Sequence, residues 1–236
     1  MNTAENLMLR TESLGKSFVL HLQGGIRISV LSDIDLKIRA GECVALSGPS
    51  GAGKSTLMRS LYGNYRADSG KIFIRHQGEM VNIAGADPRV VLAVRAESIG
   101  YVSQFLRVVP RVSALDVVAE IAIARGRPPD DARNEAAALL TRLNISPRMH
   151  TLPPATFSGG EQQRINLARG FIGGHPILLL DEPTAALDPA NRAVVIDMIL
   201  EKKSQGVALV GIFHDADMRE AVADRLFPIT PLQDAA

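Results

Sequence analysis

The sequence is nearly free of cysteine, since Cys43 is the only one among its 236 residues. Cys43 lies in an apolar run at residues 42–47 and is most simply a buried, small apolar side chain. No secretory signal is recognisable either, and a single thiol without such a signal argues against an oxidising compartment. We therefore expect a cytoplasmic protein.

Long apolar runs and an excess of one charge are also missing. No stretch approaches the roughly 20 apolar residues that span a bilayer, so any membrane-embedded partner would be a separate chain. The 26 basic and 25 acidic residues leave a net charge of +1, which gives no electrostatic case for nucleic-acid binding. Without internal repeats or low-complexity segments, the length predicts a single domain over residues 1–236.

The sequence does contain a glycine-rich loop of the form G-x-x-x-x-G-K-[ST], a Walker A motif, at residues 48–55. An apolar run precedes it and apolar residues at helical spacing follow, which predicts a strand, the loop and a helix in that order. Such a loop points backbone N–H groups at a phosphate, and the helix N-terminus adds partial positive charge. Lys54 would reach the β- and γ-phosphates and Ser55 would ligate Mg²⁺, although an ordinary glycine-rich turn is the alternative. The predicted loop residues are Gly48, Pro49, Ser50, Gly51, Ala52, Gly53, Lys54, Ser55 and Thr56.

A second feature is the apolar run at residues 177–180, which ends in the adjacent acids Asp181 and Glu182. The run suits a parallel strand that is buried on both faces. At its carboxyl end, beside the phosphate loop, Asp181 would hold Mg²⁺ directly or through water, and Glu182 would polarise an attacking water. The alternative is a pair of solvated acids, and the neighbouring loop motif favours the catalytic interpretation.

A third feature is the turn Ser158-Gly159-Gly160-Glu161. Ser158 and Glu161 fit a capping box at the start of a helix. Capping does not explain the glycines, because each costs roughly 1 kcal/mol relative to alanine in a helical turn. They indicate that something approaches the backbone closely, such as a phosphate at the helix N-terminus.

Together these motifs, in this order and over nearly the whole chain, resemble the nucleotide-binding domains of the ATP-binding-cassette (ABC) family. Phe157 and Glu161 replace the usual Leu and Gln of its signature motif, but the Ser-Gly-Gly centre is intact. The resemblance implies an α/β P-loop NTPase fold with a RecA-like core, an antiparallel β lobe and a helical lobe at about 107–170. It also implies ATP and Mg²⁺ as cofactors and ATP hydrolysis as the reaction.

The resemblance assigns roles to further residues. It implies that Phe18 stacks on adenine, that Gln104 touches Mg²⁺ and the lytic water, that Asp188 belongs to the D-loop, and that His214 contacts the γ-phosphate. The alternatives are a core aromatic, a loop amide, a helix N-cap and a structural histidine. The resemblance further implies a dimer, in which the loop of one copy and Ser158, Gly159, Gly160 and Glu161 of another sandwich ATP. The implied catalytic residues are Glu182, His214 and Gln104, and the implied metal ligands are Ser55, Gln104 and Asp181.

Local patterns predict the remaining elements. The antiparallel lobe should hold strands at 7–9, 17–22, 26–31 and 70–74, with a hairpin between the second and third. The helical lobe should hold helices at 114–118 and 131–143, separated by the breaker at 126–129. Strands at 99–103, 177–180 and 207–213 and helices near 189–203 and 217–226 complete the prediction.

Three stretches depart from the common importer pattern, at 60–65, 104–115 and 168–172, and residues 211–215 add a fourth distinctive stretch. They resemble the PhnL-type ATPases of the phosphonate carbon–phosphorus lyase system, which are ABC ATPases without a membrane partner. This resemblance implies a role in making α-D-ribose 1-methylphosphonate 5-triphosphate from ATP and methylphosphonate, with the transfer chemistry in a partner. The implied partners are other carbon–phosphorus lyase subunits, with a second ABC ATPase among the candidates. We hypothesise that they dock on the segment after Gln104, because Arg107 and Arg111 lie there amid apolar residues, and the alternative is a solvated charged loop.

Two other interpretations remain. A transport ATPase of the lipoprotein-release or macrolide-efflux type would share every catalytic residue. A nucleotide-gated scaffold would use slow hydrolysis only to time assembly. The sequence does not separate a homodimer from a heterodimer.

Overall fold

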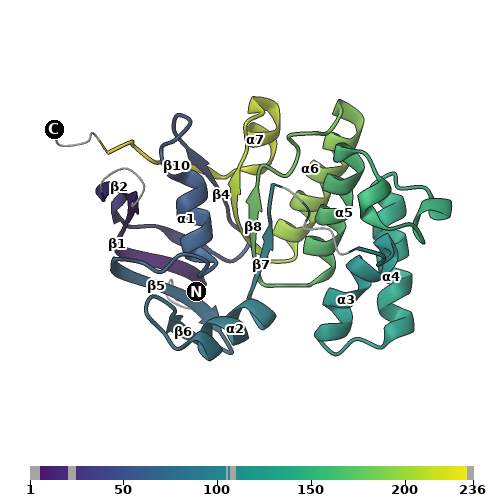
Figure 1. The fold of residues 1–236 in the computed structure, drawn as a ribbon, viewed down its shortest axis with the longest axis horizontal. Coiled ribbons are helices and arrows are strands. Elements are labelled where there is room, and N and C mark those ends of the chain that lie inside the picture. Colours follow the sequence, from purple (N-terminus) through teal and green to yellow (C-terminus); the bar gives the residue numbers. More distant parts are fainter. Residues whose placement is uncertain (1–5, 21–24, 105, 107–109, 233–236) are drawn as a thin grey trace.

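The structure, a computed structural model, describes residues 6–20, 25–104, 106 and 110–232. A parallel sheet occupies the middle of the molecule, an antiparallel sheet lies to one side of it and a group of helices to the other (Figure 1). The predicted α/β architecture with an antiparallel lobe and a helical lobe is confirmed.

The parallel sheet has the strand order β10-β4-β9-β8-β7. All five residues of β8 are buried, and successive side chains face different cores. Leu178 and Leu180 pack with the helical side, whereas Ile177 and Leu179 pack with the antiparallel side. This two-sided burial explains the unbroken apolar run. The strands are β4 (Cys43–Ser47), β7 (Ile99–Val102), β8 (Ile177–Asp181), β9 (Ala208–Ile212) and β10 (Arg225–Pro228).

Helices cover both faces of this sheet. The apolar residues of α1 (Lys54–Leu61) belong to the core on the antiparallel side, and those of α5 (Gly159–Ile172) and α6 (Pro189–Ser204) belong to the core on the other. The short α7 (Ala216–Val222) packs against α6. Because neighbouring strands run parallel, the loops that follow β4, β7, β8 and β9 meet at one edge of the sheet.

The antiparallel lobe differs from the prediction in its first strand, and it contains β3, β6 and α2, which the sequence patterns did not predict. The strands expected at 7–9 and 17–22 form one strand, β1, which changes register near Ser13, a residue at φ 44°. A bulge of this kind bends a strand without ending it, so it reads as a break in the sequence pattern. The tip of the predicted hairpin, 21–24, lies outside the described residues. The elements are β1 (Leu7–Leu20), β2 (Ile26–Ile34), β3 (Lys37–Arg39), β5 (Ser69–His76), β6 (Glu79–Asn82) and α2 (Pro88–Glu97).

The helical lobe contains α3 (Ala114–Ala124) and α4 (Pro129–Arg142), followed by two short 3₁₀ turns, Pro147–Met149 and Pro154–Thr156. Ser113 caps α3 by accepting a hydrogen bond from the Asp116 N–H. Gly126, at φ 86°, lies between the two helices as the predicted breaker. Within the described ranges, no helix combines the length and the apolar character needed to cross a bilayer.

Gly170 allows α5 to pack closely against β7. A Cβ atom at Gly170 would lie 2.2 Å from Cγ2 of Val102. We expect Gly170→Ala to lower the free energy of unfolding, because overpacking costs roughly 1–3 kcal/mol and the gain in helix propensity is only about 1 kcal/mol. Thermal unfolding should show a fall of about 2–4 °C for each kcal/mol lost. The double variant V102A/G170A should recover part of it, and a single variant with an unchanged Tm would contradict this packing argument.

Candidate active site

The glycine-rich loop joins β4 to α1, as predicted. Gly48, Gly51 and Gly53 have φ values of 140°, 79° and 99°, a region that favours glycine. Gly53 occupies the N-cap position of α1 without a side-chain cap, so no side chain occupies the first N–H groups of the helix. Free N–H groups at a helix N-terminus are a ready site for an anion.

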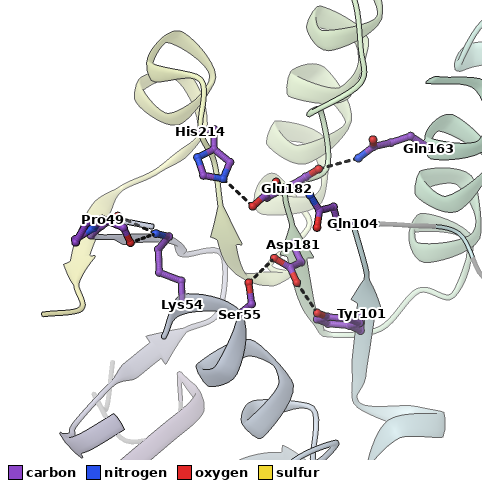
Figure 2. A network of polar contacts seen from close by, with 10 residues as sticks. Pro49, Lys54, Ser55, Tyr101, Gln104, Gln163, Asp181, Glu182 and His214 are labelled. Carbon is purple, nitrogen blue, oxygen red and sulfur yellow. Dashed lines mark hydrogen bonds and ion pairs between the residues drawn. The ribbon is translucent and has the colours of Figure 1, made fainter. Parts of the chain in front are cut away.

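Lys54 reaches back across this loop. Its Nζ donates hydrogen bonds to the backbone oxygens of Gly48 and Pro49, each at 2.8 Å (Figure 2). An ammonium has three N–H donors and no acceptor. One donor is therefore still available to an incoming phosphate, and the other two brace the loop.

Asp181 lies at the end of β8 and is 4% exposed. Its Oδ1 faces the Ser55 hydroxyl at 3.4 Å, and its Oδ2 accepts a 2.7 Å hydrogen bond from the Tyr101 hydroxyl (Figure 2). Burial raises the pKa of the Asp181 carboxyl, and the Tyr101 hydrogen bond opposes that rise. A cation beside Oδ1 would favour the ionised form further.

The donors at this point suit Mg²⁺. Ser55 and Asp181 offer oxygen atoms on one side of the loop, and Mg²⁺ takes one or two protein oxygens together with waters and substrate phosphates. No group of three or more His, Cys, Asp or Glu side chains that could hold a metal is found in the described ranges. That donor set fits a metal whose other ligands are phosphate and water.

Glu182 follows Asp181 in a left-handed backbone conformation with φ 52°. Its N–H donates to the Ile212 carbonyl at 3.1 Å, and its own carbonyl accepts a 2.7 Å hydrogen bond from the Gln163 side chain. Such a conformation costs of order 1–3 kcal/mol for a residue other than glycine and persists where surrounding contacts enforce it. These contacts hold the Glu182 backbone between β9 and α5.

The Glu182 carboxylate is held by two side chains that were predicted to join it. Oε1 is 2.7 Å from Nε2 of His214, and Oε2 accepts a 2.9 Å hydrogen bond from Nε2 of Gln104 (Figure 2). The His214 contact is a hydrogen bond to a carboxylate only when Nε2 carries the proton. The Glu182 side chain is 20% exposed and that of His214 is 61% exposed. The structure thus brings all three predicted catalytic side chains together, with Gln104 bonded to Glu182 through its amide.

The turn at Ser158 forms the predicted capping box. The Glu161 N–H donates to Ser158 Oγ at 3.4 Å, and Glu161 Oε2 accepts from the Ser158 N–H at 2.8 Å. The Ser158 hydroxyl also donates to Glu161 Oε2 at 2.7 Å, and this bond together with the one from the Ser158 N–H lowers the pKa of the Glu161 carboxyl. A Cβ at Gly160 would meet the Ala186 carbonyl at 2.8 Å, whereas one at Gly159 would meet nothing within 4 Å. The fold itself therefore accounts for Gly160, and Gly159 leaves an open backbone.

Phe18 and Asp188 lie in local packing and capping contacts. Phe18 is half-buried on β1, with its ring edge-on to Tyr65 at a centroid distance of 5.2 Å. Asp188 is the N-cap of α6 and accepts 2.8 and 2.7 Å bonds from the backbone and side chain of Asn191, which lower the pKa of its carboxyl. The capping alternative holds for Asp188, and its D-loop role stays a prediction, as does adenine stacking by Phe18.

Two residues that the motifs did not identify complete the site. Tyr101 bonds the Asp181 carboxylate, and Gln163 on α5 bonds the Glu182 carbonyl. A tyrosine in a buried strand beside the acid-bearing strand needs a partner for its hydroxyl, which is a usable signal. A 5% exposed glutamine on α5 is a weaker one, since its partner depends on the tertiary fold.

The chain is similar to known ATP-binding proteins. A family model described as ABC transporter matches residues 31–185. The lipoprotein-releasing system ATP-binding protein LolD of Idiomarina loihiensis is 37% identical over 214 residues, which cover 90% of each chain. The macrolide export ATP-binding/permease protein MacB of Sodalis glossinidius is 40% identical over 195 residues. That match covers 83% of this chain and 29% of MacB, so the chain spans less than a third of that relative.

Solved structures agree with the sequence relatives. A dimeric bacterial ABC transporter cassette, MJ0796, superposes with a TM-score of 0.85 at 26% identity and 94% coverage of both chains. The same cassette in a post-hydrolysis dimer bound to ADP and Pi gives 0.85 at 25% identity, covering 96% of this chain and 97% of that one. This chain therefore belongs to the ABC transporter family of ATP-binding cassettes.

Proposed function

We propose that this chain is a Mg²⁺-dependent ATP hydrolase that works as a pair of cassettes and drives a conformational change in partner subunits. The observation that carries the proposal is the Glu182 carboxylate, held between His214 and Gln104 directly beside Asp181. Phosphoryl transfer to water needs a group that binds the phosphates, a metal ligand and a base for the water. The phosphate loop, Asp181 and Glu182 can supply these three functions.

The phosphate loop supplies the binding energy. Lys54 turns one free N–H toward the terminal phosphates while the N-terminus of α1 adds its partial charge. Ser55 and Asp181 would hold Mg²⁺, which would neutralise charge on the phosphate oxygens. Tyr101 keeps Asp181 turned so that Oδ1 faces Ser55.

Glu182 polarises the attacking water and accepts its proton. A positioned base of this kind contributes about 10²–10⁴ in rate. Gln104 and His214 orient the carboxylate, and the exposed His214 ring is free to turn toward a terminal phosphate. The left-handed backbone at Glu182 presents the carboxylate at the sheet edge.

The second half of the site comes from another cassette. The phosphate loop precedes α1 on one face of the parallel sheet, and the Ser158 turn precedes α5 on the other. A nucleotide bound at the phosphate loop therefore lies away from Gly159 of the same chain. The open backbone at Gly159 is available to the nucleotide of a second cassette. The dimeric arrangement of MJ0796, a structural relative, supports this pairing.

The comparisons favour a transport partner. LolD, named as the ATP-binding protein of a lipoprotein-releasing system, matches 90% of both chains. By analogy, this cassette would dock a separate membrane permease and couple ATP hydrolysis to lipoprotein release or efflux.

A phosphonate-pathway role is the second candidate. It rests on the four stretches at 60–65, 104–115, 168–172 and 211–215. In this role the cassette would dock soluble carbon–phosphorus lyase subunits and support ribosyl-triphosphate transfer carried out by a partner. Arg111 lies in the described part of the expected docking face, whereas Arg107 lies outside the described residues.

Affinity purification of the full chain from a cell extract separates the two roles. A detergent-solubilised permease as the recovered partner supports the transport role, and soluble lyase subunits from a membrane-free fraction support the other. Recovery of the chain as a lone cassette pair under both conditions, at native expression level, would contradict both partner assignments.

Glu182→Gln tests the catalytic assignment. We expect ATP hydrolysis to fall by about 10²–10⁴, because the amide cannot accept the water's proton, while binding of MgATP is retained. Phosphate release and nucleotide binding are measured separately on the same protein. Glu79→Gln, at an exposed acid on β6, is the matched control and should hydrolyse ATP at the normal rate. Full hydrolysis by the Glu182 variant would exclude it as the base.

Complementation tests the pairing of two copies. Lys54→Ala removes the loop cation, and Gly159→Glu places a charged side chain where no atom of the same chain lies within 4 Å. Each variant alone should be inactive, but a mixture should regain up to roughly a quarter of wild-type activity, since half of the random pairs are mixed and each mixed pair keeps one of two sites. A mixture as inactive as its components would argue against a homodimer.

A further inference from the structure

A polar pocket opens beside the metal-suited acid, away from the phosphate loop motif. It has a volume of about 740 Å³ and lies between the end of α1, the side of α2 and the end of β7. Three arginines line it together with tyrosine rings, and the ATP-site residues Gln104 and Asp181 form one wall. The arginines are Arg59, Arg95 and Arg169.

The charges in this pocket are unbalanced. Asp181 is the only carboxylate in its lining, and none of the three arginines forms an ion pair with any carboxylate in the described ranges. Arg169, on α5, is half-buried and makes neither a hydrogen bond nor an ion pair with any residue that the structure describes. Like charges that line one pocket repel each other, and an anion between them relieves that repulsion.

Neutral groups hold the other two guanidinium groups in place. Arg59 donates to the Tyr65 hydroxyl at 2.9 Å. Arg95 donates to the Tyr62 carbonyl at 2.8 Å and to Asn64 Oδ1 at 2.9 Å, with its guanidinium 4.7 Å from the Tyr62 ring centroid. An arginine has five N–H donors, so each keeps donors for a ligand while its position is set. Preorganised guanidinium groups are well suited to bidentate binding of a tetrahedral oxyanion.

A smaller cavity continues the pocket. It has a volume of about 180 Å³, shares Arg95 and Arg169 with the larger one, and adds Arg125 and His175. Burial lowers the pKa of His175 to about 4, and Arg125 contributes to that shift. Nδ1 of this 8% exposed ring has no hydrogen-bond partner among the described residues. Arg125 therefore adds a fourth guanidinium to the same positively charged surface, and the His175 ring adds a neutral polar group.

We propose that this pocket binds a small molecule bearing a phosphate or phosphonate group, at a site separate from the triphosphate loop. The oxyanion would lie among Arg59, Arg95 and Arg169, and the tyrosine-lined volume beyond it leaves room for an organic part. A pocket of several hundred Å³ is the size range of small-molecule sites. This inference goes beyond the proposed hydrolysis and does not require it.

The proposed anion site adjoins the metal site, and Tyr101 belongs to both. The Tyr101 hydroxyl donates to Asp181 at 2.7 Å, and Tyr101 and Arg59 both line the pocket. The Tyr101 ring stacks on Tyr62 at 5.2 Å, beneath Arg95.

Binding should be measured on the full chain with its phosphate loop already filled. Saturation with Mg²⁺ and a non-hydrolysable ATP analogue is confirmed first, and a failure at this step concerns the proposed function alone. Inorganic phosphate and methylphosphonate are then titrated separately, with binding followed by ³¹P NMR and calorimetry. We expect saturable binding of at least one probe, and the tighter one identifies the class of oxyanion.

Arg169→Gln tests the location of the site. It should weaken that binding by about tenfold or more, because a charge-assisted hydrogen bond is lost, while analogue binding and Tm stay unchanged. Arg59→Gln, at an exposed position, provides a second variant and should also weaken binding of the probe. Arg148→Gln, at an exposed arginine of the helical lobe, is the matched control and should bind normally. Absence of saturable binding by both probes, or equal binding by the Arg169, Arg59 and control variants, would overturn the proposal.

Discussion

The direction of the strands is the constraint on which the site depends. Because β7, β8, β9 and β4 run parallel, the segments that follow them emerge at one edge of the sheet. Gln104, Glu182 and His214 each follow a different strand, yet their side chains meet at hydrogen-bonding distance. A single antiparallel strand in this set would send its segment to the opposite edge.

Features set by neighbours in sequence could be predicted. The loop before Lys54, the doubly buried strand that ends at Asp181 and the capping box at Ser158 each depend on a few consecutive residues. Local chemistry also favoured an N-cap at Asp188, and the structure has one. For these elements, residue type and spacing carry the physical cause.

Features set by distant partners could not be predicted. The hydrogen bond from Tyr101 to Asp181 joins residues 80 positions apart in the sequence. Gln163 reaches the Glu182 carbonyl from α5, on the helical side of the sheet. The glycine at 160 was attributed to a ligand, whereas the Ala186 carbonyl of the same chain already requires it. Strand β1 was divided in two because a bulge interrupts its alternation without ending its pairing.

The two bonds from Lys54 to its own loop carbonyls have a consequence for ligand discrimination. They brace the loop and occupy two of the three N–H donors of the Lys54 ammonium. A ligand that displaces either carbonyl oxygen from Lys54 Nζ must provide a stronger hydrogen-bond acceptor. A chain of linked phosphates that spans from the glycines to the helix end meets this condition, whereas a lone orthophosphate reaches fewer donors. The bonds of Lys54 to its own loop therefore favour binding of a polyphosphate over binding of a single small anion.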